Sequence, residues 1–321
     1  MKTMRQLAAS QFESVAALAA GMAEIHASIA AVLAGVAAGA VWVDDAARPA
    51  VAIIEGPEGS YLLGKPADAV AAAIADLLDD WVYLHVPPGA DVSAALPNRA
   101  MLAHPRLVFS LKPADLPVIL PTELTLSADA DAIGHRLFDG EMEIGRCLPD
   151  LVIGARAEIG LWVHPKYRCR GLGTLLVKTV LDAARAQGIS RIGWHCHASN
   201  RGSVAIARRF ADAPPVQALA YSASLPAENA GDLDEPPCRQ FARHFEAGEA
   251  EIVWLGFHAA CAWAEAGETG KALDAVERLA RNGWQGEPGW LAHHWALARL
   301  QQEPRFAAAL ETLKKQKAPP G

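Results

Sequence analysis

Hydrophobic and polar positions change their period several times in the middle of the chain. An apolar, strand-favouring run at 159–163 ends at Pro165, which cannot continue a central strand. From 174 to 187 the apolar residues recur every three to four positions, with charged residues on the opposite face, which is typical of an amphipathic helix. A second strand-like run at 191–196 and a second helical run at 200–210 follow. The pattern predicts the order strand, turn, helix, strand, helix.

The turn between the first strand and the first helix carries the most specific motif. Residues 168–173 read R-C-R-G-L-G. Gly171 and Gly173 allow an anion to come close to the backbone amides, and the helix that follows directs its unpaired N–H groups to the same place. Arg168 and Arg170 add guanidinium groups suited to phosphate oxygens. An ordinary glycine turn is the alternative, but the flanking elements favour a phosphate-binding turn.

Two blocks that include this turn resemble a known superfamily. They are E-I-G-L-W-V-H-P-K-Y-R-C-R-G-L-G at 158–173 and W-H-C-H-A-S-N-R-G-S-V-A-I-A at 194–207. Together they resemble the acetyl-coenzyme A-binding core of the GNAT N-acetyltransferases. The resemblance implies an α/β (α+β) fold with a mixed sheet flanked by helices. It also implies transfer of an acetyl group from acetyl-CoA to a primary amine of a small molecule or peptide, by direct attack in a ternary complex.

The resemblance also implies which residues hold the coenzyme. Backbone groups of the strand at 161–163 would pair with the pantetheine arm, and amides from 168 to 174 would hold the pyrophosphate. Asn200 and Ser203 would lie near the thiol end. The predicted coenzyme-binding residues are therefore Leu161, Trp162, Val163, Arg168, Cys169, Arg170, Gly171, Leu172, Gly173, Thr174, Asn200 and Ser203.

Acetyl transfer needs a proton acceptor for the ammonium group and a donor for the leaving thiolate. Glu158 is the predicted base, because the superfamily sometimes places a carboxylate on this strand, and partial burial is expected to raise its pKa. Pairing on the strand edge without a chemical role is the alternative for Glu158. Glu141 and Glu143 are rival bases, since the hairpin that they begin is expected to border the acceptor groove.

The donor is harder to predict. Many GNAT enzymes carry a Tyr in the helix after the second block, and Ala207 stands at that place here. Ser203, Cys196 or a water molecule is the predicted substitute. The missing Tyr also motivates a second hypothesis, a catalytically weak module that senses acyl-CoA.

Composition and charge argue against several other classes of protein. The net charge of −7, without a basic block containing aromatic residues, argues against nucleic-acid binding. The uncharged segment 27–43 is rich in Ala and Gly, so we expect a helix running into a strand and no membrane anchor. Five cysteines without C-x-x-C pairing indicate a reducing, cytoplasmic location. In H-C-H at 195–197 the cysteine would point away from the histidines, so no metal site is predicted.

The chain divides into three predicted parts. Residues 1–115 mix helical and strand-like runs and are similar to the degenerate first lobe of a bacterial two-lobed GNAT subfamily, and residues 116–226 form the acetyl-CoA-binding domain. A linker at 227–237 leads to a helical tail at 236–321 that resembles tetratricopeptide helix pairs. The tail is expected to pack against the enzyme or a second subunit. Docking of a protein partner or self-association through the tail is the alternative, and a scaffold function through it is a third hypothesis.

Individual elements are predicted as well. Residues 133–137 are expected to be helical, and four tail helices are expected, the second of them capped by Thr269. The strand-like run 81–85 and the tryptophans of the strand-like runs, Trp81 among them, are expected in the core.

Overall fold

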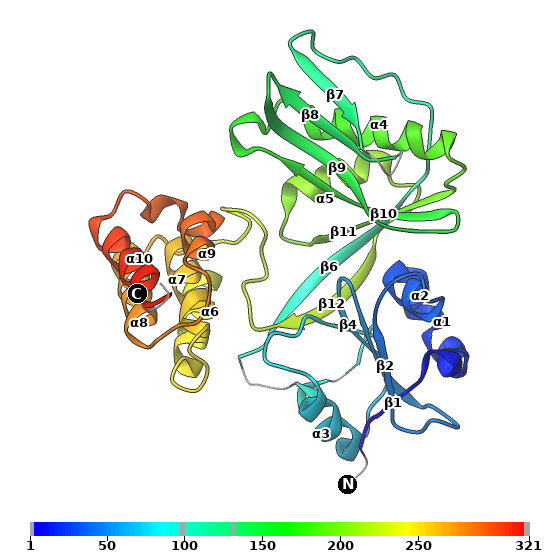
Figure 1. The fold of residues 1–321 in the computed structure, drawn as a ribbon, viewed down its shortest axis with the longest axis horizontal. Coiled ribbons are helices and arrows are strands. Elements are labelled where there is room, and N and C mark those ends of the chain that lie inside the picture. The colour runs from blue at the N-terminus through cyan, green and yellow to red at the C-terminus, as the bar shows by residue number, and fades with distance from the viewer. Residues whose placement is uncertain (1–2, 91, 97–99, 130–132, 318–321) are drawn as a thin grey trace.

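The computed structural model describes residues 3–90, 92–96, 100–129 and 133–317 (Figure 1). Within these ranges twelve strands form one sheet, and helices cover it or form the tail. The strands are β1 (Arg5–Gln6), β2 (Ala40–Val43), β3 (Val51–Gly56), β4 (Gly59–Gly64), β5 (Leu84–Val86), β6 (Leu102–Leu111), β7 (Leu124–Ala128), β8 (His135–Asp139), β9 (Met142–Ile153), β10 (Arg156–Val163), β11 (Arg191–His197) and β12 (Val216–Ser222).

The helices complete the element order. The α-helices are α1 (Ala16–Ile25), α2 (Ala27–Leu33), α3 (Asp68–Leu77), α4 (Leu172–Ala186), α5 (Arg201–Phe210), α6 (Glu235–Gly248), α7 (Leu255–Glu265), α8 (Thr269–Arg281), α9 (Pro288–His293) and α10 (Pro304–Lys317). Short 3-10 helices lie at η1 (Ala9–Val15), η2 (Ser93–Ala95), η3 (Pro165–Tyr167) and η4 (Trp295–Leu300).

The sheet joins the two predicted lobes without a break. Its strand order is β1-β2-β3-β4-β5-β12-β6-β11-β10-β9-β8-β7. Strands of the first lobe fill one end and β7 to β11 fill the other, with β6 and β12 paired between them (Figure 1). The chain passes from β6 toward β7 at the predicted 115/116 boundary. The two lobes therefore share the centre of the sheet.

The central acetyltransferase-like region forms as its hydrophobic period predicts. The apolar stripe of α4, including Leu176, Val177 and Val180, is fully buried against β8, β9 and β10. Gly188 has φ +74 just after the end of α4, a conformation that glycine adopts without steric cost and that commonly terminates helices. The α/β fold class is confirmed.

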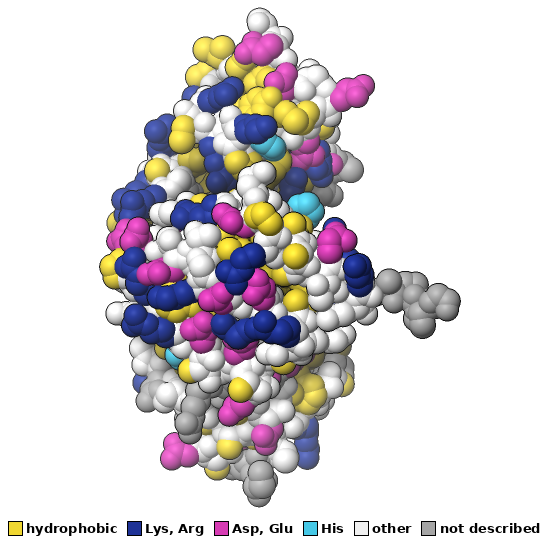
Figure 2. All heavy atoms as spheres, turned by 90° about the vertical axis from the view of Figure 1, so that its left-hand side faces the viewer, with side chains coloured by type: hydrophobic (Ala, Val, Ile, Leu, Met, Phe, Trp, Pro, Cys, Tyr) yellow, Lys and Arg dark blue, Asp and Glu magenta, His cyan; other side chains and the backbone are white. Residues whose placement is uncertain are grey.

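The helical tail packs on the first lobe. Side chains of α6, α7 and α8 share one hydrophobic core with residues of α3, β5 and η2. On the tail face that Figure 2 shows, basic and acidic side chains are interspersed. Several are paired with each other, as Arg305 is with Asp274 and Glu277 at 2.7 Å each. The tetratricopeptide resemblance stays a prediction.

Four local predictions are wrong. Residues 133–137 do not form a helix: β8 lies there and pairs with β7 and β9, because Leu137 alternates onto the buried face of a hairpin. Trp81 is 58% exposed in a turn before β5, where its ring stacks on Trp254 with centroids 4.4 Å apart. Helix α6 starts inside the predicted linker. Glu268, not Thr269, is the N-cap of α8.

The segment 27–43 forms α2 followed by β2, as predicted. Across the described ranges, no helix combines the length and apolar character that crossing a bilayer requires.

Candidate functional site

The R-x-x-G-x-G motif forms a turn into the N-terminus of α4. Gly171 is the N-cap of α4 at φ +79, and Cys169 also has a positive φ, +59. No acidic side chain lies in the first turn of the helix, so its N–H groups keep their positive potential. A Cβ added at Gly173 would lie 2.9 Å from Ile206 Cδ1 and 3.2 Å from Leu161 Cδ2. The turn thus has the backbone geometry of an anion site.

Strands β10 and β11 separate directly in front of this turn. Their parallel pairing covers only Arg156 to Glu158 on β10, opposite 191–193. Beyond Glu158, β10 continues along β9 to Val163, while β11 pairs with β6. A register shift in the β9–β10 ladder between Glu158 and Ile159 marks the point of divergence. The separation leaves a slot between two strands whose backbone groups on that side are free of strand partners.

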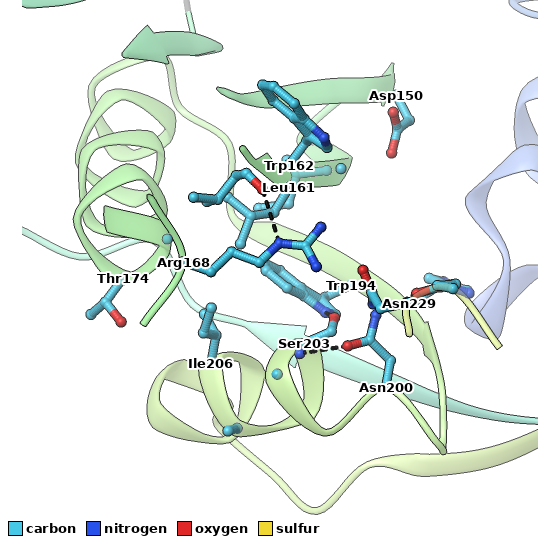
Figure 3. Close-up of a pocket in the computed structure, with 18 of the residues that line it drawn as sticks. Asp150, Leu161, Trp162, Arg168, Thr174, Trp194, Asn200, Ser203, Ile206 and Asn229 are labelled. Atoms are coloured by element: carbon cyan, nitrogen blue, oxygen red, sulfur yellow. Dashed lines mark hydrogen bonds between the residues drawn. The ribbon is translucent and has the colours of Figure 1, made fainter. Parts of the chain in front are cut away.

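A cavity of about 960 Å³ follows the slot from the turn to the first lobe (Figure 3). It is lined at the α4 end by the turn, by 159–163 and by the start of α5. Its other end is formed by segments far apart in the sequence. Those lining residues are Glu58, Tyr83, His85, Arg106, Asp150, Glu158, His195, Glu228 and Asn229.

All but one of the predicted coenzyme-binding residues line this cavity. The exception is Arg170, whose guanidinium group stacks over the Tyr167 ring at 5.1 Å. Arg168 lies at the cavity and donates from Nε to the Val163 carbonyl oxygen at 3.1 Å (Figure 3). Its remaining N–H groups are left to face a ligand.

Asn200 and Ser203 are tied into the start of α5. The Asn200 side chain accepts a hydrogen bond from the Ser203 backbone N–H at 3.0 Å (Figure 3) and donates one to Glu228 at 2.5 Å. Ser203 Oγ accepts a hydrogen bond from Trp194 Nε1 at 2.9 Å. The Ser203 hydroxyl also shares a side-chain hydrogen bond with the Cys196 thiol. Ala207 is completely buried and does not reach the cavity.

Glu158 lies where the two lobes meet. Its side chain is 3% exposed, and Oε1 accepts hydrogen bonds from Ala27 N–H at 2.7 Å and from Arg156 at 2.9 Å. His195 Nε2 lies 3.4 Å from the same oxygen. Burial opposes ionisation, but His195, the Ala27 N–H and Arg156 together hold the Glu158 pKa at about 2. The expected upward shift is wrong, because these partners stabilise the carboxylate.

The alternative acids and bases lie elsewhere. Glu141 and Glu143 belong to the β8–β9 hairpin and do not line the cavity. Glu143 is paired with Arg136 at 3.0 Å and with Arg146 at 2.8 Å. Cys196 is buried in the core of the sheet, also away from the cavity, and burial raises the pKa of its thiol.

Sequence reasoning missed the carboxylates that the first lobe and β9 bring to the cavity. Burial, followed by the negative charges of Glu158 and Asp150, raises the pKa of Glu58 to about 8. Burial and Glu158 also raise the pKa of Asp150. Glu58 lies in the tight turn between β3 and β4, and Asp150 is the extra residue of the β9 bulge. A hairpin turn and a bulge give no periodic sequence signal, so neither residue stood out.

Two histidines near these carboxylates, His26 and His85, are buried and neutral. Burial, and then His195, lowers the pKa of His26 to about 3, and burial places the pKa of His85 well below its usual value. Arg106 and Arg156 carry permanent positive charges near this end of the cavity. In the described part of the chain, no cluster of three His, Cys, Asp or Glu side chains is arranged to hold a metal ion.

Comparison with known proteins shows what this chain is similar to. Residues 132–211 match the family model described as acetyltransferase (GNAT) family. The fold is similar to a GCN5-related N-acetyltransferase-like protein from Streptococcus suis 89/1591, with a TM-score of 0.52 and 17% identity over 67% of this chain and 98% of that one. A GCN5-related N-acetyltransferase from Sphaerobacter thermophilus aligns with a TM-score of 0.48 and 13% identity, over 68% and 93% of the two chains.

Proposed function

Because residues 132–211 match the model of the GNAT acetyltransferase family, we propose that this chain transfers an acetyl group from acetyl-CoA to a primary amine of a small molecule or peptide. The observation that carries this proposal is the slot between β10 and β11, which leads directly into the Gly171 turn at the start of α4. The slot offers unpaired backbone groups to an extended chain, and the turn offers amides to a phosphate.

The residues at the turn fit a coenzyme diphosphate. Gly171 is in the left-handed conformation, Gly173 has no side chain between α4 and the slot, and Arg168 supplies a cation on the same side. Acetyl-CoA bound here brings the acetyl thioester as the acyl donor. The backbone of 161–163 and the amides from 168 to 174 are the groups we propose to bind it.

The proposed reaction is a direct displacement. The neutral amine attacks the thioester carbonyl carbon, a C–N bond forms and the C–S bond breaks. In this proposal a backbone N–H near Val163 polarises the carbonyl oxygen. The Ser203 hydroxyl gives its proton to the leaving sulfur and takes in its place the proton that the nitrogen loses. Because Glu158 is held ionised, its role in this proposal is to attract the cationic amine, and it is a weak proton acceptor.

Calorimetry and turnover test this function together. We expect saturable binding of acetyl-CoA to the wild type and release of free thiol with at least one amine of a broad panel. Gly173→Val is expected to abolish binding, because its side chain would fill the space beside Ile206 and Leu161. Gly270→Val is the matched control, since nothing lies within 4 Å of a Cβ at this exposed position. Absence of acetyl-CoA binding in the wild type would reject the proposal.

An acyl-CoA sensor is the second candidate, favoured by the buried Ala207 at the place of the usual Tyr. Tight binding of acetyl-CoA without thiol release from any amine would support the sensor. An active Glu158→Gln variant equal to the wild type would remove Glu158 from the acceptor site.

We also propose a reducing, cytoplasmic location and a chiefly structural tail. The cysteines are free, and four of them are buried. The tail shares its core with the first lobe, which supports a role in holding that lobe. Deletion of residues 238–321 is expected to lower the solubility of the rest of the chain, and a fully soluble, monodisperse truncation would favour an independent scaffold role for the tail.

A further inference from the structure

The acceptor end of the cavity contains a bulge that directs a carboxylate inward. Glu158 pairs with Leu151, and Ile159 pairs with Pro149, so Asp150 is the unpaired extra residue of β9. Its carboxylate lies over Gly160: a Cβ there would be 2.8 Å from Asp150 Oδ2. Asp150 lies on the side of the pocket opposite Thr174, away from the phosphate turn (Figure 3).

A second carboxylate is seated in the same way on the next pair of strands. A Cβ at Gly193 of β11 would be 2.9 Å from Glu158 Cγ and 3.2 Å from its Oε1. Glu158 Oε1 is fully engaged, and the Glu158 carboxylate also shares a side-chain hydrogen bond with Glu58. His85, 4% exposed and also at the cavity, has a buried Nδ1 without a hydrogen-bond partner. A buried polar atom of this kind costs free energy unless a ligand or water satisfies it, so His85 points to a polar ligand.

The charges at this end do not balance. Four carboxylates line it, those of Glu58, Asp150, Glu158 and Glu228. Arg156 lies 2.9 Å from Glu158, and Arg106 lies 3.4 Å from Glu228. Neither Glu58 nor Asp150 forms an ion pair with a basic side chain in the part of the chain that the structure describes. Asp150 is thus left for a cation from outside, and Glu58, whose pKa is raised to about 8, adds a second negative charge only where it ionises.

We propose that the acceptor is an aliphatic diamine without a carboxylate, held between Asp150 and the Glu58–Glu158 pair, and that Glu58 of the first lobe receives the proton of the reacting ammonium group. The inference rests on the proposed acetyl transfer and names its substrate class. A carboxylate on the acceptor would be repelled by the unpaired Asp150 carboxylate, which disfavours amino acids as acceptors.

The proton balance assigns separate roles to the two carboxylates. The ammonium group gives one proton to ionised Glu58, and the resulting amine attacks the thioester carbonyl carbon. The second proton, lost from nitrogen as the C–N bond forms, goes to the sulfur as the C–S bond breaks. Asp150 pairs with the second ammonium group and exchanges no proton. A carboxyl group with a pKa near 8 suits proton transfer near neutral pH, which supports Glu58 in this role.

The test compares three acceptors with the same alkyl chain: 1,5-diaminopentane, 1-aminopentane and lysine. Thiol release by the wild type is expected to give kcat/KM about tenfold higher for the diamine than for the monoamine, since a charge-assisted contact is gained, and lower still for lysine. Asp150→Asn should bring the kcat/KM values for the diamine and the monoamine to within about twofold of each other, because only the contact with the second ammonium group is lost. Glu143→Gln is the control, because Glu143 lies on the same strand but outside the cavity. This variant should keep the preference for the diamine over the monoamine.

Glu58→Gln tests the proton acceptor. Gln resembles the protonated carboxyl group, so folding should be retained. The ratio of wild-type to variant kcat with the diamine should rise between pH 6 and pH 8, as Glu58 ionises, and this ratio cancels the titration of the amine itself. A ratio that does not change with pH overturns the role of Glu58.

Direct binding separates this inference from the proposed function. Calorimetry with 1,5-diaminopentane alone should show binding that Asp150→Asn weakens about tenfold, whether or not acetyl transfer occurs. Diamine binding without acetyl-CoA binding would leave the acceptor site standing and reject the acetyltransferase. Acetyl transfer to lysine as fast as to the diamine, or a diamine preference that survives Asp150→Asn, overturns the substrate class.

Discussion

Replacement of Glu158 by Gln is expected to destabilise the protein by about 3 kcal/mol at pH 7, on the scale of removing one partner of a buried ion pair. The carboxylate is 3% exposed and accepts hydrogen bonds from both lobes: from the N–H of Ala27, the first residue of α2, and from Arg156 on β10. Arg156 also donates to the carbonyl oxygens of Ala23 and Ile25. Glu158→Gln leaves this arginine buried without its counter-charge.

The pKa of Glu158 gives the same magnitude independently. A fall from 4.5 to about 2 on folding corresponds to about 3 kcal/mol of stabilisation, at about 1.4 kcal/mol for each pH unit. Because the folded-state pKa is the lower one, this contribution is complete above pH 4.5 and is lost as the pH falls toward 2. The difference between wild type and Glu158→Gln should therefore shrink over that range.

Urea denaturation followed by circular dichroism measures both effects. The free energy of unfolding is compared for wild type and Glu158→Gln at pH 7 and at steps down to pH 3. Glu143→Gln is the matched control: its carboxylate also pairs with arginines but is 26% exposed, so a loss below about 1 kcal/mol is expected. The reasoning would be refuted if Glu158→Gln lowered the free energy of unfolding as little as Glu143→Gln does, or if its effect did not depend on pH.

Two further changes test the reaction and the packing of the tail. Ser203→Ala should lower kcat by about 100-fold with little change in acetyl-CoA binding, because general acid catalysis is lost; a kcat within twofold of the wild type in the thiol-release assay removes Ser203 as the donor. Trp254→Ala should lower the free energy of unfolding in urea by about 1 kcal/mol or more, because the stack on Trp81 is lost. An unchanged urea midpoint would show that this contact does not hold the tail to the first lobe.

Local periodicity predicted the elements whose hydrophobic pattern is unambiguous. Helix α4 has seven buried positions at helical spacing and a glycine after its end, so its limits were predicted to within two residues. The segment 133–137 was predicted to be a helix, because a run of five residues is too short to distinguish the hydrophobic period of a helix from that of a strand. Only its pairing with β7 and β9 made it a strand. The surroundings of Trp81 were likewise decided by tertiary structure, because its ring stacks on Trp254, 173 positions away in the sequence.

The glycine turn and its surroundings were predictable because they are built from neighbours in sequence. A strand, a glycine turn and a helix N-terminus within 158–174 give the backbone geometry of an anion site. The reach of the cavity into the first lobe was not predictable in this way. It depends on β6 and β12, which join strands from both lobes in one sheet.

The sequence by itself thus indicated a resemblance to the GNAT superfamily and the place of the glycine turn, since both lie in one short stretch. The tertiary structure decided the other end of the cavity, where Glu58, Asp150 and Glu158 meet from a hairpin turn, a bulge and a strand. It also decided which carboxylate ionises. The physical reason is that a pKa depends on burial and on charges a few ångströms away, and these neighbours are brought together only by folding.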